Sequence, residues 1–167
     1  METDLRYATA TVDDTASFLE AVGWVAQETG TRIVLFDAER MAGREHAASA
    51  LAHAARSFAR GDPIARTFEM EALLYAAGTR QTRVAKGFGI HEGENRCWVA
   101  VTPPEERAWS LLVGLVRFEP APGVLEPAQR QRLCELFAIT PAELETVGED
   151  RLSDLVLERV ALLDANR

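Results

Sequence analysis

Two arginines stand where a helix is expected to begin, directly after a glycine. The run Glu71–Lys86 reads as the end of one helix, a stop at Gly78 and a second helix capped by the hydroxyl of Thr79. Arg80 and Arg83 then fall in the first turn, where the helix dipole normally favours acidic residues. Free N–H groups and guanidinium groups both bind phosphate, so this spacing indicates an anion site. The alternative is that both arginines are simply solvated at the surface, and the chemistry of the residues alone favours this alternative.

These arginines belong to a basic island in an acidic chain. The 167 residues carry a net charge of −8. Residues 56–86 nevertheless hold six basic and three acidic side chains, a net of +3, whereas residues 1–55 carry −5 and residues 87–167 carry −6. An acidic protein is a poor general binder of nucleic acid, but if the island also clusters in space, it is the place for an anionic partner. Its basic side chains are Arg56, Arg60, Arg66, Arg80, Arg83 and Lys86.

Other patterns that could do chemistry are incomplete. Gly87-Phe-Gly89 begins a Gly-x-Gly motif, but Glu92 occupies the position of the third glycine, so no dinucleotide site is predicted. His46 and His53 lie seven residues apart on one helix, too distant to chelate one metal, and are expected to be solvated or capping. We therefore expect no catalytic residue, metal, cofactor or small-molecule substrate, and no enzyme activity.

Composition and length are typical of one globular domain over residues 1–167. Hydrophobic residues make up 47% of the chain and charged residues 26%. No apolar run reaches the roughly 18 residues that a membrane span needs, and the N-terminus lacks a signal pattern, so we expect a cytoplasmic protein without membrane contact. Cys97 and Cys134 have no neighbouring ligand residues and are expected to be buried free thiols.

Hydrophobic periodicity predicts an α+β fold, with a small three-stranded, mostly antiparallel sheet packed with seven or eight helices. The strand at Leu5–Val12 alternates polar and apolar residues, which is typical of a half-exposed or edge strand. Ile33–Phe36 is apolar on both faces and is expected to be central. The third strand is Arg96–Val101. Helices are predicted at about residues 15–28, 44–60, 63–77, 80–86, 103–115, 128–138, 141–147 and 151–165.

Helix start signals place several of these boundaries. Asp13 and Asp14 are candidate caps for the first helix. Asp62-Pro63 combines a capping side chain with proline at the first helical position. The segments Thr102-Pro-Pro-Glu105 and Thr140-Pro-Ala-Glu143 both read as capping boxes.

The last helix has more apolar positions than one buried face requires. One apolar row comprises Leu152, Val156, Val160 and Leu163. Leu155 and Leu162 flank this row. The row can pack on the protein's own core, and the surplus either packs on a neighbouring helix or meets a partner. A terminal helix is often tucked in, so the pattern alone favours the intramolecular option.

Residues 71–81 also resemble the signature of a known family, the kinase-binding small subunit of the KEOPS (EKC) complex. This is the family of the eukaryotic PRPK-binding protein and its archaeal counterparts. The segment Gly87–Ile90 and the strand after it are similar to the family's order of elements, and Leu155–Leu163 resembles its last helix. The resemblance implies a non-catalytic adaptor that binds the kinase/ATPase subunit and supports threonylcarbamoylation of the adenosine next to the tRNA anticodon. For archaeal members it also implies binding of the 3′ CCA end of tRNA.

The resemblance thus predicts two surfaces. An apolar surface around Ile139, Leu144, Leu155 and Leu162 would bind the kinase subunit. The basic island would bind tRNA through Arg80, Arg83, Lys86, Gln81, Arg66, Arg60 and Arg56. Phe68 and Tyr75 are candidates for stacking on bases, although burial in the core is expected for both. Two alternatives stay open: a protein-interaction module that makes no contact with RNA, and a small enzyme whose site the sequence does not reveal.

Overall fold

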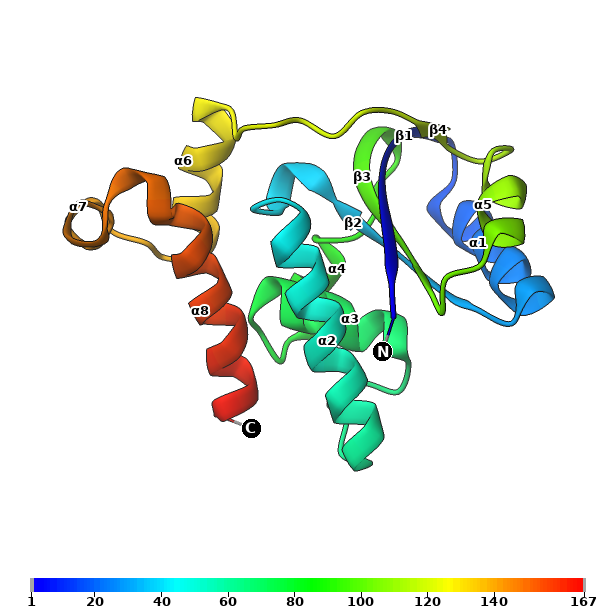
Figure 1. Ribbon diagram of the computed structural model, residues 1–167, viewed down its shortest axis with the longest axis horizontal. Coiled ribbons are helices and arrows are strands. Elements are labelled where there is room, and N and C mark those ends of the chain that lie inside the picture. The colour runs from blue at the N-terminus through cyan, green and yellow to red at the C-terminus, as the bar shows by residue number, and fades with distance from the viewer. Residues whose placement is uncertain (1, 167) are drawn as a thin grey trace.

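A computed structural model describes residues 2–166 and shows an α+β fold with eight α-helices and a four-stranded sheet (Figure 1). The strands are β1 (Asp4–Val12), β2 (Arg32–Asp37), β3 (Gly93–Thr102) and β4 (Arg117–Phe118). The helices are α1 (Thr15–Thr29), α2 (Arg44–Arg60), α3 (Phe68–Ala77), α4 (Thr82–Lys86), α5 (Glu106–Leu112), α6 (Pro127–Leu136), α7 (Pro141–Val147) and α8 (Leu152–Ala165). Two 3₁₀ turns, η1 (Ala38–Arg40) and η2 (Glu149–Arg151), complete the order.

The sheet is antiparallel throughout, in the order β2-β3-β1-β4. The sequence predicted three strands and missed β4, which has only two residues and pairs with β1 at Ala8 and Thr9. It also assigned the positions wrongly. β1 lies inside the sheet between β3 and β4, whereas β2 lies at an edge. Apolar residues on both faces of β2 indicate only that both faces are covered, and helices cover them here.

Helices cover the two faces of the sheet and enclose two apolar cores. α1 and α5 pack on one face, while α2, α3 and α8 lie on the other, as Figure 1 shows. Alternation along β3 divides its side chains between the layers. Trp98 and Ala100 enter the core beneath α2 and α3, and Cys97 and Val99 enter the core beneath α1 and α5.

The C-terminal third forms a separate helical arm that returns to the core. After the long loop at residues 119–126, the side chain of Gln129 on α6 donates to the carbonyls of Ala38 and Met41, at 2.8 and 2.9 Å, and fixes α6 to η1. α8 then runs back along α2 and α3, and its apolar row is buried, as predicted.

Local capping signals place several helix ends correctly. Asp14 caps α1 by accepting from the backbone N–H of Ser17, and Thr140 caps α7 by accepting from that of Glu143. Gly78 ends α3 in the left-handed conformation, with φ of 64°, and its N–H and that of Thr79 bond back to the carbonyls of the last turn.

Two of the other predicted starts are wrong, because their residues are used elsewhere. Residues 62–67 are irregular, and α3 begins only at Phe68 under a cap from Thr67. Thr102 still belongs to β3, where it pairs with Arg32, so α5 begins at Glu106 instead. α5 also ends at Leu112, short of the predicted Leu115.

The cysteines are free thiols, as expected. Cys97 is fully buried and Cys134 is only half-buried, so the expectation of burial is correct for the first alone. No helix within residues 2–166 is long and apolar enough to cross a membrane.

Candidate nucleic-acid and protein interface

The turn after Gly78 differs from its sequence prediction in a way that changes the chemistry. The Thr79 hydroxyl accepts from the N–H of Gln81, at 3.1 Å, and does not cap the helix. α4 begins at Thr82, has only five residues and lacks a side-chain cap, so Arg80 precedes it. Because so short a helix has little dipole, an anion site at its N-terminus is not supported. Any attraction for anions must come from the side-chain charges themselves.

Four predicted RNA-binding cations are exposed and unpaired: Arg66, Arg80, Arg83 and Lys86. Within residues 2–166, none of their side chains makes an ion pair or hydrogen bond. Gln81 is also exposed. Arg80, Arg83 and Lys86 lie in one segment, residues 80–86, which we call the cation segment. This segment includes α4, which packs against α3.

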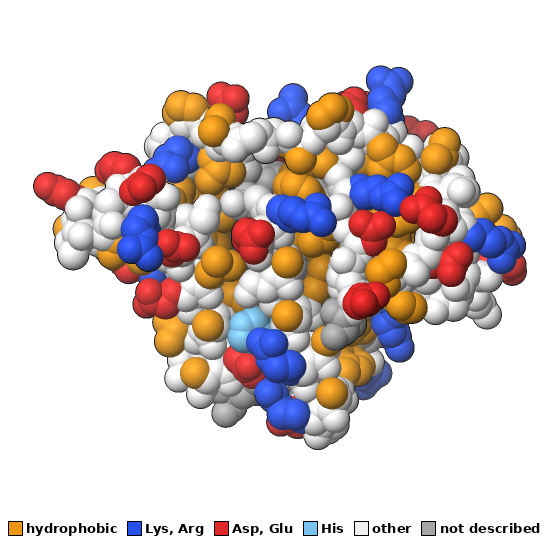
Figure 2. Space-filling view, viewed as in Figure 1, with side chains coloured by type: hydrophobic (Ala, Val, Ile, Leu, Met, Phe, Trp, Pro, Cys, Tyr) orange, Lys and Arg blue, Asp and Glu red, His pale blue; other side chains and the backbone are white. Residues whose placement is uncertain are grey.

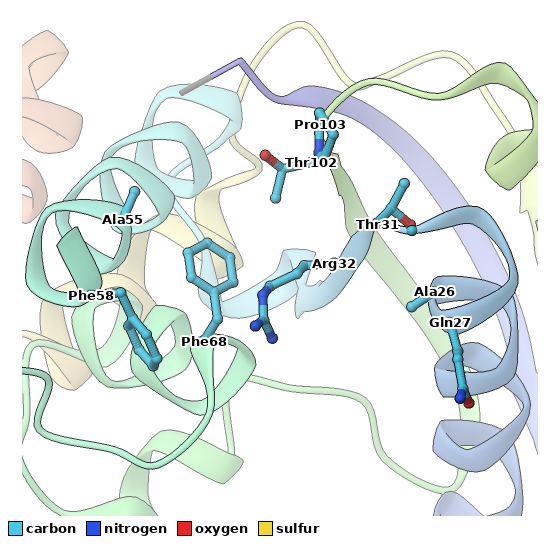
Figure 3. Close-up of a pocket in the computed structure, with 10 residues that line it drawn as sticks. Ala26, Gln27, Thr31, Arg32, Ala55, Phe58, Phe68, Thr102 and Pro103 are labelled. Carbon is cyan, nitrogen blue, oxygen red and sulfur yellow. The ribbon is translucent and has the colours of Figure 1, made fainter. Parts of the chain in front are cut away.

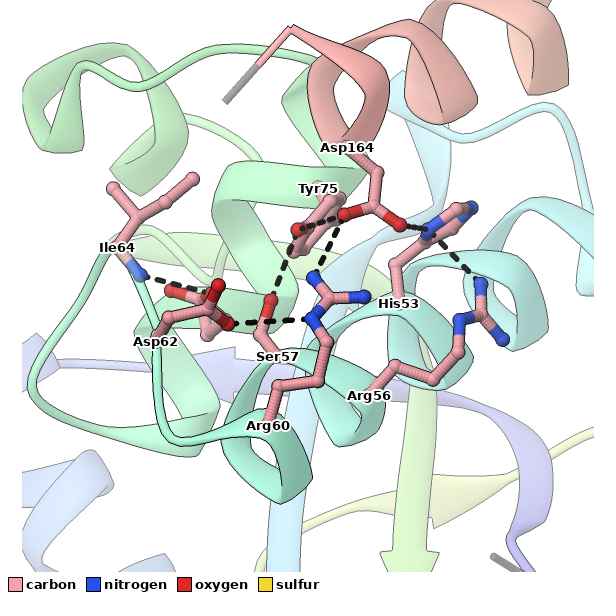
Figure 4. A network of polar contacts seen from close by, with 9 residues as sticks. His53, Arg56, Ser57, Arg60, Asp62, Ile64, Tyr75 and Asp164 are labelled. Atoms are coloured by element: carbon pink, nitrogen blue, oxygen red, sulfur yellow. Dashed lines mark hydrogen bonds and ion pairs between the residues drawn. The ribbon is translucent and has the colours of Figure 1, made fainter.

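The other two predicted cations, Arg56 and Arg60, are drawn into contacts within the protein. Asp164, near the end of α8, is the centre of these contacts (Figure 4). Arg60 donates to Asp164 at 3.0 Å and to Asp62 at 3.3 Å. The hydroxyl of Tyr75 donates to the same Asp164 oxygen at 3.2 Å. Asp164 thereby ties α8 to α2 and α3, and Arg60 has a structural partner about a hundred residues away in the sequence.

His53 contacts the other carboxylate oxygen of Asp164, and Arg56 lies against the same ring nitrogen of His53. Nδ1 of His53 lies 3.1 Å from the Asp164 carboxylate and 3.0 Å from a guanidinium nitrogen of Arg56. A carboxylate only accepts, so Nδ1 must carry its hydrogen toward Asp164, and the Arg56 contact cannot then be a hydrogen bond. Burial lowers the pKa of His53, while the hydrogen bond to Asp164 opposes that shift. Arg56 is therefore more weakly held than Arg60.

The two stacking candidates are buried, as expected. Phe68 is 4% exposed, and Tyr75 is fully buried with its ring stacked on His53 at 5.1 Å. Neither side chain is available to a base. His53 is half-buried, with 12% of its side chain exposed. His46 is not solvated: it is 1% exposed, with Nδ1 accepting from the N–H of Ala42 and Nε2 lying 2.8 Å from the carbonyl of Ala76.

Glu71 holds the loop that carries Arg66. Its carboxylate is fully buried and accepts from the N–H groups of Ile64 and Ala65, at 3.0 and 2.7 Å. These two bonds explain why the chain after Pro63 does not begin a helix, since the side chain of Glu71 fixes its N–H groups in a loop. Glu71 is thus a positioning residue for Arg66, which no sequence pattern indicated.

Lys86 lines a cleft with two cations that the sequence analysis missed. The cleft has a volume of about 330 Å³ and lies between η1, the end of α4 and α6. Arg40 comes from η1 and Arg132 from α6, so three basic side chains converge from distant segments. No local signal could have found this grouping, because it depends on how α6 docks on η1.

A larger hollow lies on the α1 side of α2 and α3 (Figure 3). It has a volume of about 590 Å³ and is open to solvent. Its one charged side chain, Arg32, lies 5.9 Å from the ring of Phe68 and 3.6 Å from a carboxylate oxygen of Glu69. Its guanidinium is therefore already engaged, and the hollow lacks a free charge.

Three of the four predicted kinase-binding residues lie in the core. Ile139, Leu144 and Leu155 are 5 to 8% exposed and pack in the cluster beneath α2 and α3. Only Leu162 is accessible, at 46%. The predicted apolar surface is therefore not present as predicted, because three of its four residues pack in the core and only Leu162 is accessible.

The exposed side of α8 and the cation segment are neighbours. A Cβ at Gly78 would lie 3.5 Å from the carbonyl of Arg159, so α8 passes directly beside the turn that precedes Arg80. The face shown in Figure 2 has basic and acidic side chains interspersed over α2 and its surroundings, without a large patch of one sign. The unpaired charge of the basic island is accordingly that of the cation segment and Arg66.

No family model matches this chain, and no curated protein matches it.

Proposed function

We propose that this chain is a non-catalytic adaptor subunit of a KEOPS-type tRNA-modification complex. It binds the kinase/ATPase subunit of that complex through α8 and the 3′ CCA end of tRNA through the cation segment, in support of threonylcarbamoyladenosine formation. The identity of the complex and of the CCA end follows from the resemblance of residues 71–81. The choice of surfaces is supported by the exposure of Leu162 and by the lack of internal partners for the cation segment among residues 2–166.

One observation carries the RNA half of the proposal. In a chain with 26 acidic side chains against 18 basic ones, Arg80, Arg83 and Lys86 have no carboxylate partner among residues 2–166. Arg60 and Arg159 both have such partners. Cations that lack an internal partner in an acidic protein keep their full attraction for an external anion. RNA phosphate is such an anion, and guanidinium groups suit it well.

The pure interaction module remains the second candidate, because a specific observation favours it. One of the predicted RNA contacts, Arg60, is ion-paired with Asp164, and Arg56 lies against the ring of His53 beside it. The basic island therefore offers fewer free charges than the sequence suggested. A module of this kind would bind the kinase subunit equally well and show no dependence on the CCA end.

The kinase half is tested by one substitution on α8. Leu162→Asp puts a charge on an exposed position, so the fold should be unaffected, while affinity for the kinase subunit should fall by about tenfold or more if the side chain is buried in the interface. Isothermal titration calorimetry with the purified kinase subunit measures this change.

Val113→Asp is the matched control. Val113 is 64% exposed at the end of α5, on the opposite side of the sheet from α8. The Val113→Asp substitution makes the same change of an apolar residue to an acid, and it should leave the affinity for the kinase subunit unchanged. Equal affinity of the Leu162→Asp variant and the unmodified chain would show that α8 is not the kinase surface.

A further inference from the structure

The cleft beside Lys86 has the properties of a small-ligand site. Its charged walls include Asp37, Glu39, Arg40, Lys86 and Arg132. Its volume of about 330 Å³ lies at the lower end of the range of small-molecule pockets, which is roughly 300–1,000 Å³. Residues from three separate segments, at positions 37–40, 86–91 and 132, meet there, so the chain has to be folded before the cleft exists.

The walls of the cleft are held by contacts within the protein. Arg132 donates to the carbonyl of Glu39 at 3.4 Å, and the docking of α6 through Gln129 fixes its base. Arg40 lies against the backbone at Gly87, where a Cβ would come within 2.9 Å of its guanidinium nitrogen. A side chain at position 87 would therefore make the end of the Arg40 side chain shift. Lys86, in contrast, has no partner among residues 2–166.

A buried carboxylate adds a second kind of recognition. Asp37 is 6% exposed and accepts from the N–H of Glu39 at 3.0 Å, while its other oxygen lies 3.7 Å from Arg40. This contact is an ion pair without a hydrogen bond, so the Asp37 oxygen can still accept a hydrogen bond from a ligand. Burial raises the pKa of Asp37 above its ordinary value, with the hydrogen bond from Glu39 opposing the shift.

We propose that this cleft binds a nucleoside 5′-phosphate, with Lys86 and Arg132 on the phosphate and Asp37 accepting from a hydroxyl or amino group of the nucleoside. Three cations against two carboxylates leave an excess of positive charge for the phosphate. A fully ionised inorganic anion would use the cations alone and would donate no hydrogen bond to this Asp37 oxygen. The ligand is either a free mononucleotide or the terminal nucleotide of an RNA strand.

Calorimetric titration of the full chain with adenosine 5′-monophosphate tests the proposal. We expect saturable binding with a Kd below about 1 mM, and a loss of about tenfold or more in both Arg132→Ala and Lys86→Ala. Arg107→Ala, an exposed arginine on α5 across the sheet, should bind as the unmodified chain does. A thermal melt of each variant shows whether it remains folded.

The remaining titrations separate the features of the ligand. Adenosine without phosphate, and inorganic phosphate without nucleoside, should each bind at least about tenfold more weakly than the nucleotide. Displacement of the nucleotide by RNA ending in CCA, but not by RNA lacking it, identifies the RNA terminus as the source, and absence of displacement identifies the free nucleotide. Absence of saturable binding, or equal affinity in all variants, would overturn the proposal. The adaptor function is tested through Arg80, Arg83 and Leu162, so its failure would be seen separately.

Discussion

Replacement of Glu71 by alanine is expected to lower the free energy of unfolding by about 3 kcal/mol, because two half-buried backbone N–H groups lose their acceptor and a fully buried side chain is removed. The carboxylate of Glu71 is fully buried and bonded to the backbone of Ile64 and Ala65. Alanine leaves these donors unsatisfied and also opens a small cavity under α3. Chemical denaturation followed by circular dichroism measures the change.

Two further variants give this prediction its controls. Glu71→Gln keeps one acceptor oxygen and should have an intermediate effect. Glu69→Ala removes a carboxylate two residues away whose contact with Arg32 is at the surface, so it should change stability by only about 0.5 kcal/mol or less. Equal effects of Glu69→Ala and Glu71→Ala would contradict the positioning role that we assign to Glu71.

The stability of the protein is expected to fall as pH is lowered from about 6.5 to about 4, chiefly because of His46. Burial lowers the pKa of His46 to about 4, against the opposing hydrogen bond with Ala76. In the unfolded chain His46 titrates near its ordinary pKa, so the unfolded state binds the proton first and gains free energy as pH falls. The loss amounts to about 3 kcal/mol across this window. Stability is retained above pH 6.5, where both states are neutral.

Substitution isolates this contribution from that of the other titrating groups. His46→Gln retains polar atoms near Ala42 and Ala76 but cannot titrate, so its unfolding free energy should vary much less between pH 6.5 and 4. His53 has a pKa that burial lowers in the same direction, so some dependence will remain. An unchanged pH dependence in the His46→Gln variant would contradict this explanation. Denaturant titrations at four or five pH values supply the measurement.

Local chemistry made much of the secondary structure predictable. Caps at Asp14 and Thr140 and the stop at Gly78 act within a few residues, so they can be read from the sequence. The failures have non-local causes. Asp62-Pro63 is a good start signal, but Glu71 binds the N–H groups that follow it. Strand order could not be derived either, because it is set by the pairing of β3 with β1 and β2, which lie about sixty to ninety residues earlier in the sequence.

The candidate site was predictable only in part, for a similar reason. Exposure of Arg80, Arg83 and Lys86 follows from their local context. The engagement of Arg60 depends on Asp164, and the meeting of Lys86 with Arg132 depends on the docking of α6. On α8, the apolar row is readable from periodicity, but only the neighbouring helices decide that Leu155 is buried and Leu162 exposed. Charge counts and helical spacing carry no information on such distant partners.

The central claim is that the cation segment binds the 3′ end of tRNA, and a salt series tests it most directly. The purified chain is titrated with tRNA carrying or lacking its terminal CCA. The double variant Arg80→Glu/Arg83→Glu is compared with Arg107→Glu/Arg117→Glu, which makes the same change of charge on α5 and β4. We expect binding that weakens as salt rises, needs the CCA end, and falls by about tenfold or more in the first variant alone. Equal binding with and without CCA, or equal loss in both variants, would contradict the claim.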